Sequence, residues 1–68
     1  ERTVFLGEVG LTGEVRSVPF SELRAKEIAL MNYKKLICSV QAAEKLKGHF
    51  DIEIIGIRNA IEIRDIIS

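Results

Sequence analysis

Three evenly spaced glycines stand in the stretch GEVGLTGEV, residues 7–15. This is the first pattern in the chain that could form a phosphate-binding loop. A P-loop needs Lys and then Ser or Thr after its last glycine, so that these side chains reach the phosphates and magnesium. Here Gly13 is followed by Glu14 and Val15, and the carboxylate would repel a phosphate. A dinucleotide-binding fingerprint needs unequal glycine gaps that open a helix. The stretch therefore predicts a hairpin turn and excludes a phosphate site.

Few other side chains could support catalysis or metal binding. Cys38 and His49 are each the only residue of their type, so we expect no metal site and no internal disulfide. Cys38 stands in an apolar run and is expected to be a small core residue. Glu8 and Glu14 could form a carboxylate pair, but we expect them to be solvated charges on the hairpin. The lone thiol fits the reducing cytosol, and we expect a cytoplasmic protein.

The formal net charge of zero hides an uneven distribution of charge along the chain. Residues 24–49 hold six Lys and Arg against two Glu, a net charge of +4, while residues 1–23 and 51–68 each carry −2. A basic middle segment could face a polyanion, and a solvated mixed surface is the alternative. The six cations are Arg24, Lys26, Lys34, Lys35, Lys45 and Lys47. Tyr33 beside two of them could stack on nucleic acid, or it could pack in the core.

Strands and helices alternate along the chain in the expected order. Strand formers flank the glycines, Pro19 ends the second strand, and Ser21 offers an oxygen that could cap a helix. Asn32 and Gly48 fit the left-handed backbone that ends a helix, and Asn59 with Glu62 matches a capping box. The expected elements are hairpin strands at 4–6 and 15–18, a helix at 22–31, a strand at 35–40, a helix at 42–47, a strand at 51–57 and a final helix through 67, with a strand at 61–64 as an alternative.

Helices between strands predict parallel pairing through right-handed crossovers, in the α/β class with α+β as the alternative. Residues 1–68 form one domain at most, since so short a chain buries only about 60% of its unfolded surface. The apolar content is 47%, Ile is concentrated between residues 52 and 67, and no apolar run approaches the roughly 18 residues of a membrane span. The chain begins at Glu1 and its only methionine is Met31. We therefore expect a partial domain, whose excess apolar surface is covered by further sequence or by another subunit.

The stretch FLGEVGLTGEVRSV, followed by a helix that begins near SELRAKE, resembles the C-terminal Lon-protease-like domain of the RadA/Sms family of bacterial DNA repair ATPases. The segments YKK, EKLKG and IEIIGI fall in the family's order, so the resemblance runs over nearly the whole chain. It implies the second half of a Lon-like domain, of the ribosomal-protein-S5-domain-2 type, with the first half upstream of Glu1. Residues 39–42 depart from the family's Pro-Lys-x-Asn segment, and Asn32 stands where the family often has glycine.

The resemblance also implies a function and partners. The domain would form part of a hexameric ring and contact DNA without sequence preference, through the six cations named above. ATP hydrolysis with magnesium and a zinc-binding segment would lie elsewhere in the longer protein, and no cofactor is expected in these residues. A pure assembly module without DNA contact is an alternative.

A Lon-type Ser-Lys protease fragment is the other alternative. Lon-type proteases carry their lysine at the start of the helix after the hairpin, and the matching position here is Glu22. Lys26 lies one helical turn further on, and the protease serine would belong to the missing half. No histidine or lysine partner is expected for the serines present, Ser17, Ser21, Ser39 and Ser68. We therefore expect no catalytic residue in this chain.

Overall fold

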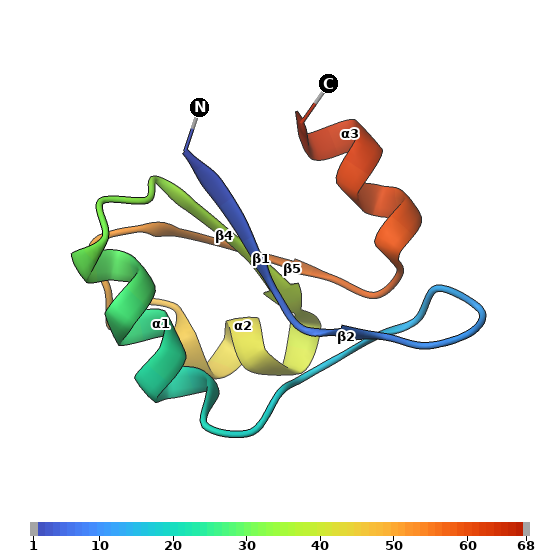
Figure 1. Cartoon of the computed structure of the whole chain (residues 1–68), viewed down its shortest axis with the longest axis horizontal. Coiled ribbons are helices and arrows are strands. Elements are labelled where there is room, and N and C mark those ends of the chain that lie inside the picture. Colours follow the sequence, from blue (N-terminus) through green and yellow to red (C-terminus); the bar gives the residue numbers. More distant parts are fainter. Residues whose placement is uncertain (1, 68) are drawn as a thin grey trace.

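A three-stranded parallel sheet forms the centre of the computed structural model, which describes residues 2–67 (Figure 1). Glu1 and Ser68 lie outside the described residues. The strands are β1 (Thr3–Leu6), β4 (Lys35–Ser39) and β5 (Glu53–Ile57), in the order β1-β4-β5, and both pairings are parallel. The apolar run of β4 places it in the middle of the sheet, since a central parallel strand is covered on both faces. The α/β class and the parallel pairing are confirmed.

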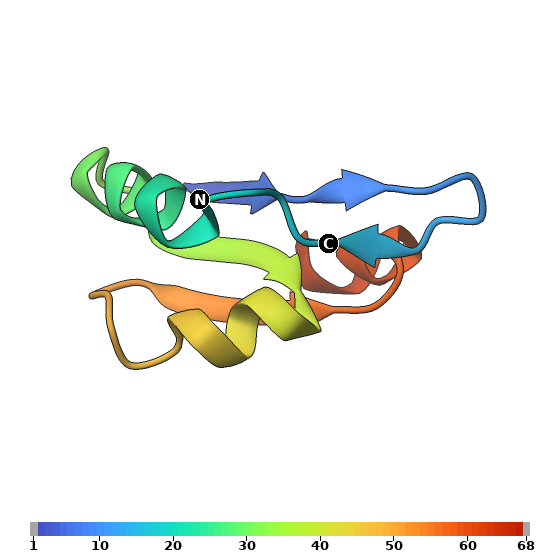
Figure 2. The same cartoon turned by 90° about the horizontal axis from the view of Figure 1, so that it is seen from below.

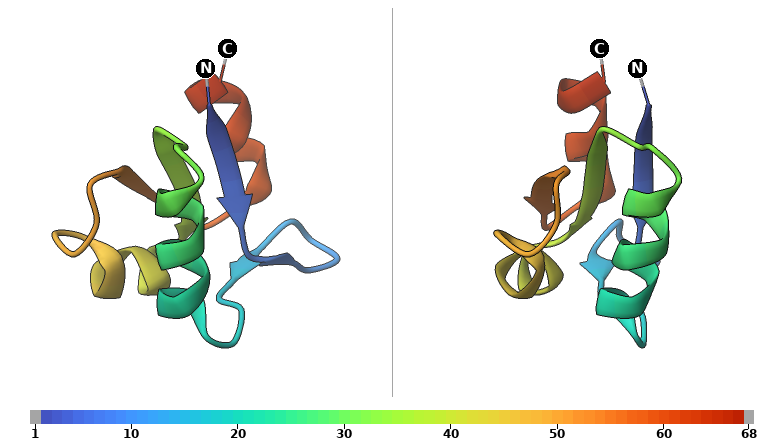
Figure 3. Two further views of the ribbon diagram at one scale, coloured as in Figure 1. Left: turned by 60° about the vertical axis from the view of Figure 1, so that its left-hand side comes forward. Right: turned by 90° about the vertical axis from the view of Figure 1, so that its left-hand side faces the viewer.

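Helices cover both faces of the sheet (Figures 2 and 3). On one face, α1 (Ser21–Leu30) and α2 (Val40–Leu46) pack on Leu36, Cys38 and Ile54. On the other face, the 3₁₀ turn η1 (Ala60–Glu62) and α3 (Ile63–Ile67) pack on Ile37 and Ile57. Within residues 2–67 no helix is long and apolar enough to cross a membrane.

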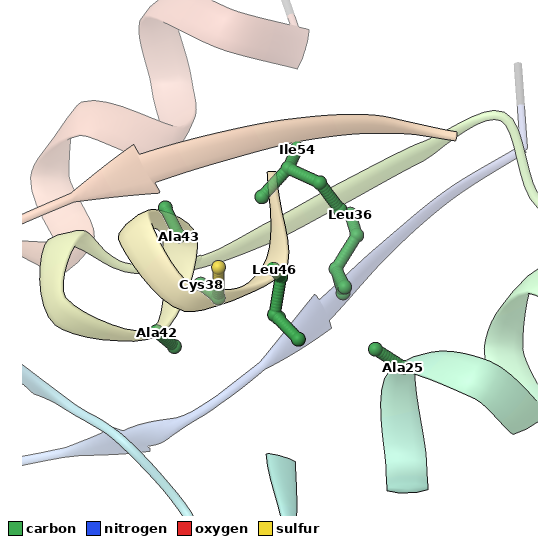
Figure 4. Close-up of a cluster of buried hydrophobic side chains, with 7 residues drawn as sticks. All are labelled: Ala25, Leu36, Cys38, Ala42, Ala43, Leu46 and Ile54. Carbon is green, nitrogen blue, oxygen red and sulfur yellow. The ribbon is translucent and has the colours of Figure 1, made fainter. Parts of the chain in front are cut away.

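The larger core cluster lies under α2 (Figure 4). Gly56 of β5 is paired with Cys38 of β4 and lies directly beneath the helix. A Cβ atom at Gly56 would lie 2.9 Å from the Cβ of Ala43 and 3.1 Å from the Cα of Val40. Real Cβ atoms do not approach other carbons this closely, so the missing side chain lets α2 sit close to the sheet.

The hairpin exists, but its first strand is not the expected one. It is formed by β2 (Glu8–Val9) and β3 (Val15–Arg16), whereas residues 4–6 belong to β1 and pair with β4. The expectation that residues 4–6 pair with residues 15–18 is wrong, because pairing with β4 brings the apolar side chains of β1 into the core clusters. Val4 and Leu6 pack on one face of the sheet, and Phe5 packs on the other.

The turn of the hairpin is fixed by backbone contacts. Gly13 has φ +90°, the left-handed region that favours glycine, while Gly7 and Gly10 do not. The N–H of Gly10 donates to the carbonyl of Glu14 at 2.8 Å, and the N–H of Ala60 donates to the carbonyl of Gly13 at 2.8 Å. The hairpin is therefore tied to the segment that follows β5.

Most of the predicted helix ends are confirmed. Asn32 and Gly48 have φ +65° and +84°, and Asn59 and Glu62 form the capping box. Ser21 is not the cap that we expected. It is the first residue of α1, and the N-cap position is held by Phe20, in the left-handed conformation and with no side-chain cap. The alternative strand at 61–64 is wrong, since these residues are helical.

Candidate functional site

A surface hollow of about 520 Å³ lies between the start of α1 and the end of α2. Its walls are the β3–α1 connection, the first turn of α1 and one side chain of α2; the lining residues are Ser17, Val18, Pro19, Phe20, Ser21, Glu22, Leu23 and Lys45. We call it the α1–α2 hollow. Glu22, which the resemblance matches to the Lon-type lysine, lines this hollow together with Lys45 of α2.

A second hollow of about 480 Å³ lies at the other end of α1. It is lined by Ala29, Asn32, Tyr33, Lys34, Phe50, Asp51, Ile52 and Glu53, and we call it the Tyr33 hollow. The guanidinium of Arg2 lies 4.7 Å from the centre of the Tyr33 ring and donates at 2.9 Å to the carbonyls of Met31 and Asn32. Tyr33 is half-buried and outside the two core clusters. Arg2 therefore already lies over the Tyr33 ring, which we considered for stacking on nucleic acid.

The predicted cations do not gather on one uniformly basic face. Glu22 lines the hollow beside α2, and Lys26 follows it by one turn, so Lys26 projects from that flank of α1. Arg24 is two residues from Lys26 and projects from the opposite flank, because residues two apart on a helix do not face each other. The buried Ala25 lies between them, against the core.

Acidic side chains accompany several of these lysines. Lys45 shares the α1–α2 hollow with Glu22, while Lys34 shares the Tyr33 hollow with Asp51 and Glu53. Lys47 is exposed at the C-cap of α2, and Lys35 is half-buried at the start of β4. The basic character of residues 24–49 is thus diluted in space by carboxylates from the flanking segments.

Glu14 on the hairpin is held as a carboxylate. It accepts hydrogen bonds from the Thr12 hydroxyl and from Arg16 Nη2, the latter at 2.7 Å. These contacts, the one with Thr12 first, lower the pKa of Glu14 to about 2. An acid with so low a pKa does not exchange protons near neutral pH. Glu14 therefore fixes the hairpin and is unsuited to general acid-base catalysis with Glu8.

The nucleophilic side chains near the sheet have structural partners. Burial raises the pKa of the Cys38 thiol, which is fully buried, so it is a poor nucleophile. The Oγ atoms of Ser39 and Ser17 lie 2.6 Å apart, and Ser39 Oγ accepts from the N–H of Ala42 at 3.1 Å, capping α2. Among residues 2–67 there is no group of three His, Cys, Asp or Glu side chains that could hold a metal ion.

Three structural roles were missed by reasoning from the sequence. They are the cap that Ser39 places on α2, the contact of Arg2 with Tyr33, and the left-handed backbone of Phe20. The first could have been found, since Ser before a run of helix formers is a cap signal. The other two have no local signal, because they depend on how distant segments meet.

Comparison with known proteins finds similarity to proteins named DNA repair protein RadA. No protein-family model matches the chain. DNA repair protein RadA of Bacillus subtilis (strain 168) is 46% identical over 61 residues, which cover 85% of this chain and 13% of that protein. The chain is related to RadA. The proteins of the same name from Aquifex aeolicus (strain VF5) and Streptococcus pyogenes serotype M3 (strain MGAS315) are 37% and 38% identical over 60 and 53 residues.

The similarity to RadA spans most of this chain and little of the relatives. It covers 88% and 78% of the chain for the two latter proteins, but only 14% and 12% of their own lengths. The chain thus matches about an eighth of RadA.

Proposed function

We propose that the chain is a non-catalytic module of a RadA-type DNA repair and recombination protein. The observation that carries this proposal is the 46% identity over 61 residues to a protein named for DNA repair. The chain would be the second half of a C-terminal Lon-like domain. The order of strand, hairpin, helix, strand, helix, strand and helix supports this placement. ATP, magnesium and zinc would be bound by other parts of the longer protein, which would assemble as a hexamer in the cytoplasm.

The module would contact DNA through its phosphates, without reading the sequence. Phosphate contacts need cations that are free to reach outward; Lys26 on α1 and Lys45 on α2 are exposed, and Lys45 lines the α1–α2 hollow. Lys34 and Lys47 extend the same set toward the Tyr33 hollow and the end of α2. Arg24 projects from the other flank of α1, so one duplex would not reach it together with Lys26.

Fluorescence anisotropy with a labelled duplex tests the DNA contact. Each cation that contacts a phosphate adds about 0.9 to the slope of log K against log salt concentration. We expect the variant Lys26→Gln/Lys45→Gln to lower this slope by about 1.8. The matched control is Arg58→Gln/Arg64→Gln, which removes the same charge from exposed sites after β5 and on α3. No binding at low salt, or equal slopes for the two variants, would refute the contact.

A fragment of a Lon-type protease is the second candidate, favoured by the place of Glu22 in the α1–α2 hollow beside Lys45, Ser17 and Ser21. We expect no proteolysis, because Glu22 is a carboxylate and cannot act as the neutral amine that activates the serine in a Ser-Lys pair. Hydrolysis of an unfolded protein substrate by the unmodified chain is the test. Activity of the unmodified chain would contradict this expectation, and Glu22→Lys in the complete domain tests whether only the lysine is lacking.

A further inference from the structure

Phe20 holds an aromatic ring in solvent at the α1–α2 hollow. The residue is 76% exposed and lines the hollow. Figures 1 and 3 show the β3–α1 connection, which carries it, at the outside of the molecule. Its φ of +59° lies in the left-handed region, which a bulky residue rarely adopts, and so exposed a ring gains little from burial to offset this strain. Strained backbone of this kind is found at ligand-binding sites, so Phe20 is a candidate contact.

The start of α1 needs the backbone of Phe20 but not its ring. The carbonyl of Phe20 accepts a hydrogen bond from the N–H of Arg24 at 3.1 Å, whereas its side chain caps nothing. Glycine adopts the left-handed region without strain, so this helix start does not call for an aromatic residue. Neither the core nor the helix start explains the ring, and a ligand that contacts it would.

The walls of the hollow suit a flat ligand with apolar faces and a polar edge. Beside the Phe20 ring they offer apolar side chains, two serine hydroxyls and the carboxylate of Glu22. The edges of nucleobases carry N–H and amino donors, and such oxygens accept their hydrogen bonds. A phosphate has acceptors only, and the Glu22 carboxylate would repel it. The hollow therefore fits a base better than a phosphate.

Two lysines beside the hollow suit the phosphates of the same strand. Lys45 lines the hollow from α2, and Lys26 is exposed on α1, one turn after Glu22. Proteins that bind single-stranded nucleic acid combine cations for the backbone with aromatic rings on which bases stack. In a duplex the bases are already paired and stacked, so the Phe20 ring reaches only an unpaired base.

We propose that the α1–α2 hollow binds one unpaired base of DNA, which stacks on Phe20 while Lys26 and Lys45 hold the neighbouring phosphates. The inference rests on the proposed DNA contact and adds to it a site for the base. Every base has an aromatic face, so stacking on Phe20 agrees with a contact that does not read the sequence.

Two oligonucleotides of equal length and charge separate the base from the phosphates. One is a short oligothymidine, and the other carries abasic sugars in place of the nucleosides. In fluorescence anisotropy, we expect the unmodified chain to bind the oligothymidine about 5- to 150-fold more tightly. Equal affinities would overturn the base site and leave the phosphate contact standing. Binding of neither oligonucleotide nor of duplex at low salt would overturn the DNA contact as well.

Phe20→Gly separates base binding from folding. Glycine relieves the left-handed strain, so the variant should melt at the same temperature as the unmodified chain or higher. It should nevertheless bind the two oligonucleotides equally, with its affinity for duplex unchanged. Phe20→Tyr keeps the ring and should keep the preference for bases. Phe20→Leu keeps the apolar bulk and the strained backbone, and it should lose most of the preference. A Phe20→Leu variant that retains it in full would overturn the proposal.

Lys26→Gln/Lys45→Gln tests the phosphates of the same strand. Each phosphate contact to single-stranded DNA adds about 0.7 to the slope of log K against log salt concentration, so the slope should fall by about 1.4 for both oligonucleotides. The ratio of the two affinities should stay the same. Leu11→Ala is the control, since Leu11 is fully exposed but lies on the hairpin. An unchanged slope in the lysine variant, or loss of the base preference in Leu11→Ala, would overturn the proposal.

Discussion

Gly56→Ala is the sharpest test of how α2 is packed on the sheet. The new methyl group would lie 2.9 Å from the Cβ of Ala43 and 3.1 Å from the Cα of Val40, so the helix must move. Adding a methyl to a packed site costs about 1–3 kcal/mol. Replacing glycine by alanine also restricts the unfolded chain, which stabilises by about 0.4–1 kcal/mol, because Gly56 is not in the left-handed region. We expect a net loss of about 1–2 kcal/mol.

This loss is large for so small a chain. A protein of this size has a free energy of unfolding of roughly 3–10 kcal/mol. A loss of 1–2 kcal/mol lowers the midpoint of thermal unfolding by roughly 4–16 °C, which circular dichroism resolves easily. Urea denaturation gives the same difference as a free energy.

A double-mutant cycle shows that the contact with α2 is the cause. Ala43→Gly alone should cost about 1–2 kcal/mol, through lower helix propensity and the lost methyl group. Combined with Gly56→Ala, it removes the nearest clashing atom, so the double variant should be about 1 kcal/mol more stable than additivity gives. Gly48→Ala is the control: its Cβ would meet nothing within 4 Å, so its cost is backbone strain alone and should add to that of Ala43→Gly. A Gly56→Ala variant as stable as the wild type would refute the reasoning.

Three further predictions concern the polar and buried side chains. Ser39→Ala should cost about 0.5–2 kcal/mol in urea denaturation, because α2 loses its cap, whereas Ser17→Ala should cost less since Ser17 is exposed. The pKa of Glu14 is about 2 in the folded chain and 4.5 in the unfolded chain. Its contribution to the free energy of unfolding is therefore full above pH 4.5 and is lost as the pH falls toward 2. The difference in melting temperature between the wild type and Glu14→Gln should therefore shrink over this interval, and a constant difference would contradict the contact. Cys38 should react with a thiol reagent at least about 100-fold more slowly in the native than in the unfolded chain, and equal rates would mean that it is not buried.

The sequence predicts best those features that a few neighbouring residues decide. The capping box of Asn59 and Glu62 and the left-handed backbone of Asn32 and Gly48 are confirmed, because each depends on contacts within one turn. The helices and the two later strands were found with ends off by a residue or two. Helix ends fray, and such shifts are ordinary.

Pairing partners were harder to predict. The strand at 4–6 looked like half of a hairpin because the glycine turn follows it, yet it pairs with β4, about thirty residues away. Local turn signals cannot show that a further pair of short strands, β2 and β3, forms the hairpin instead. Phe20 is a similar case: a bulky residue rarely adopts φ +59°, and the surrounding chain must hold it there.

The distribution of charge in space differs most from what the sequence suggests. This difference reduces the number of cations that one DNA duplex could contact. Arg24 and Lys26 are two residues apart in the sequence, but they project from opposite flanks of α1. Six phosphate contacts would give a salt slope of about 5.4, whereas the Lys26 and Lys45 pair alone would give about 1.8. Because acidic side chains share both hollows with the lysines, we expect a slope nearer the lower value in the isolated chain. A measured slope near the higher value would mean that duplex DNA contacts both flanks of α1, which requires more than one copy of the chain.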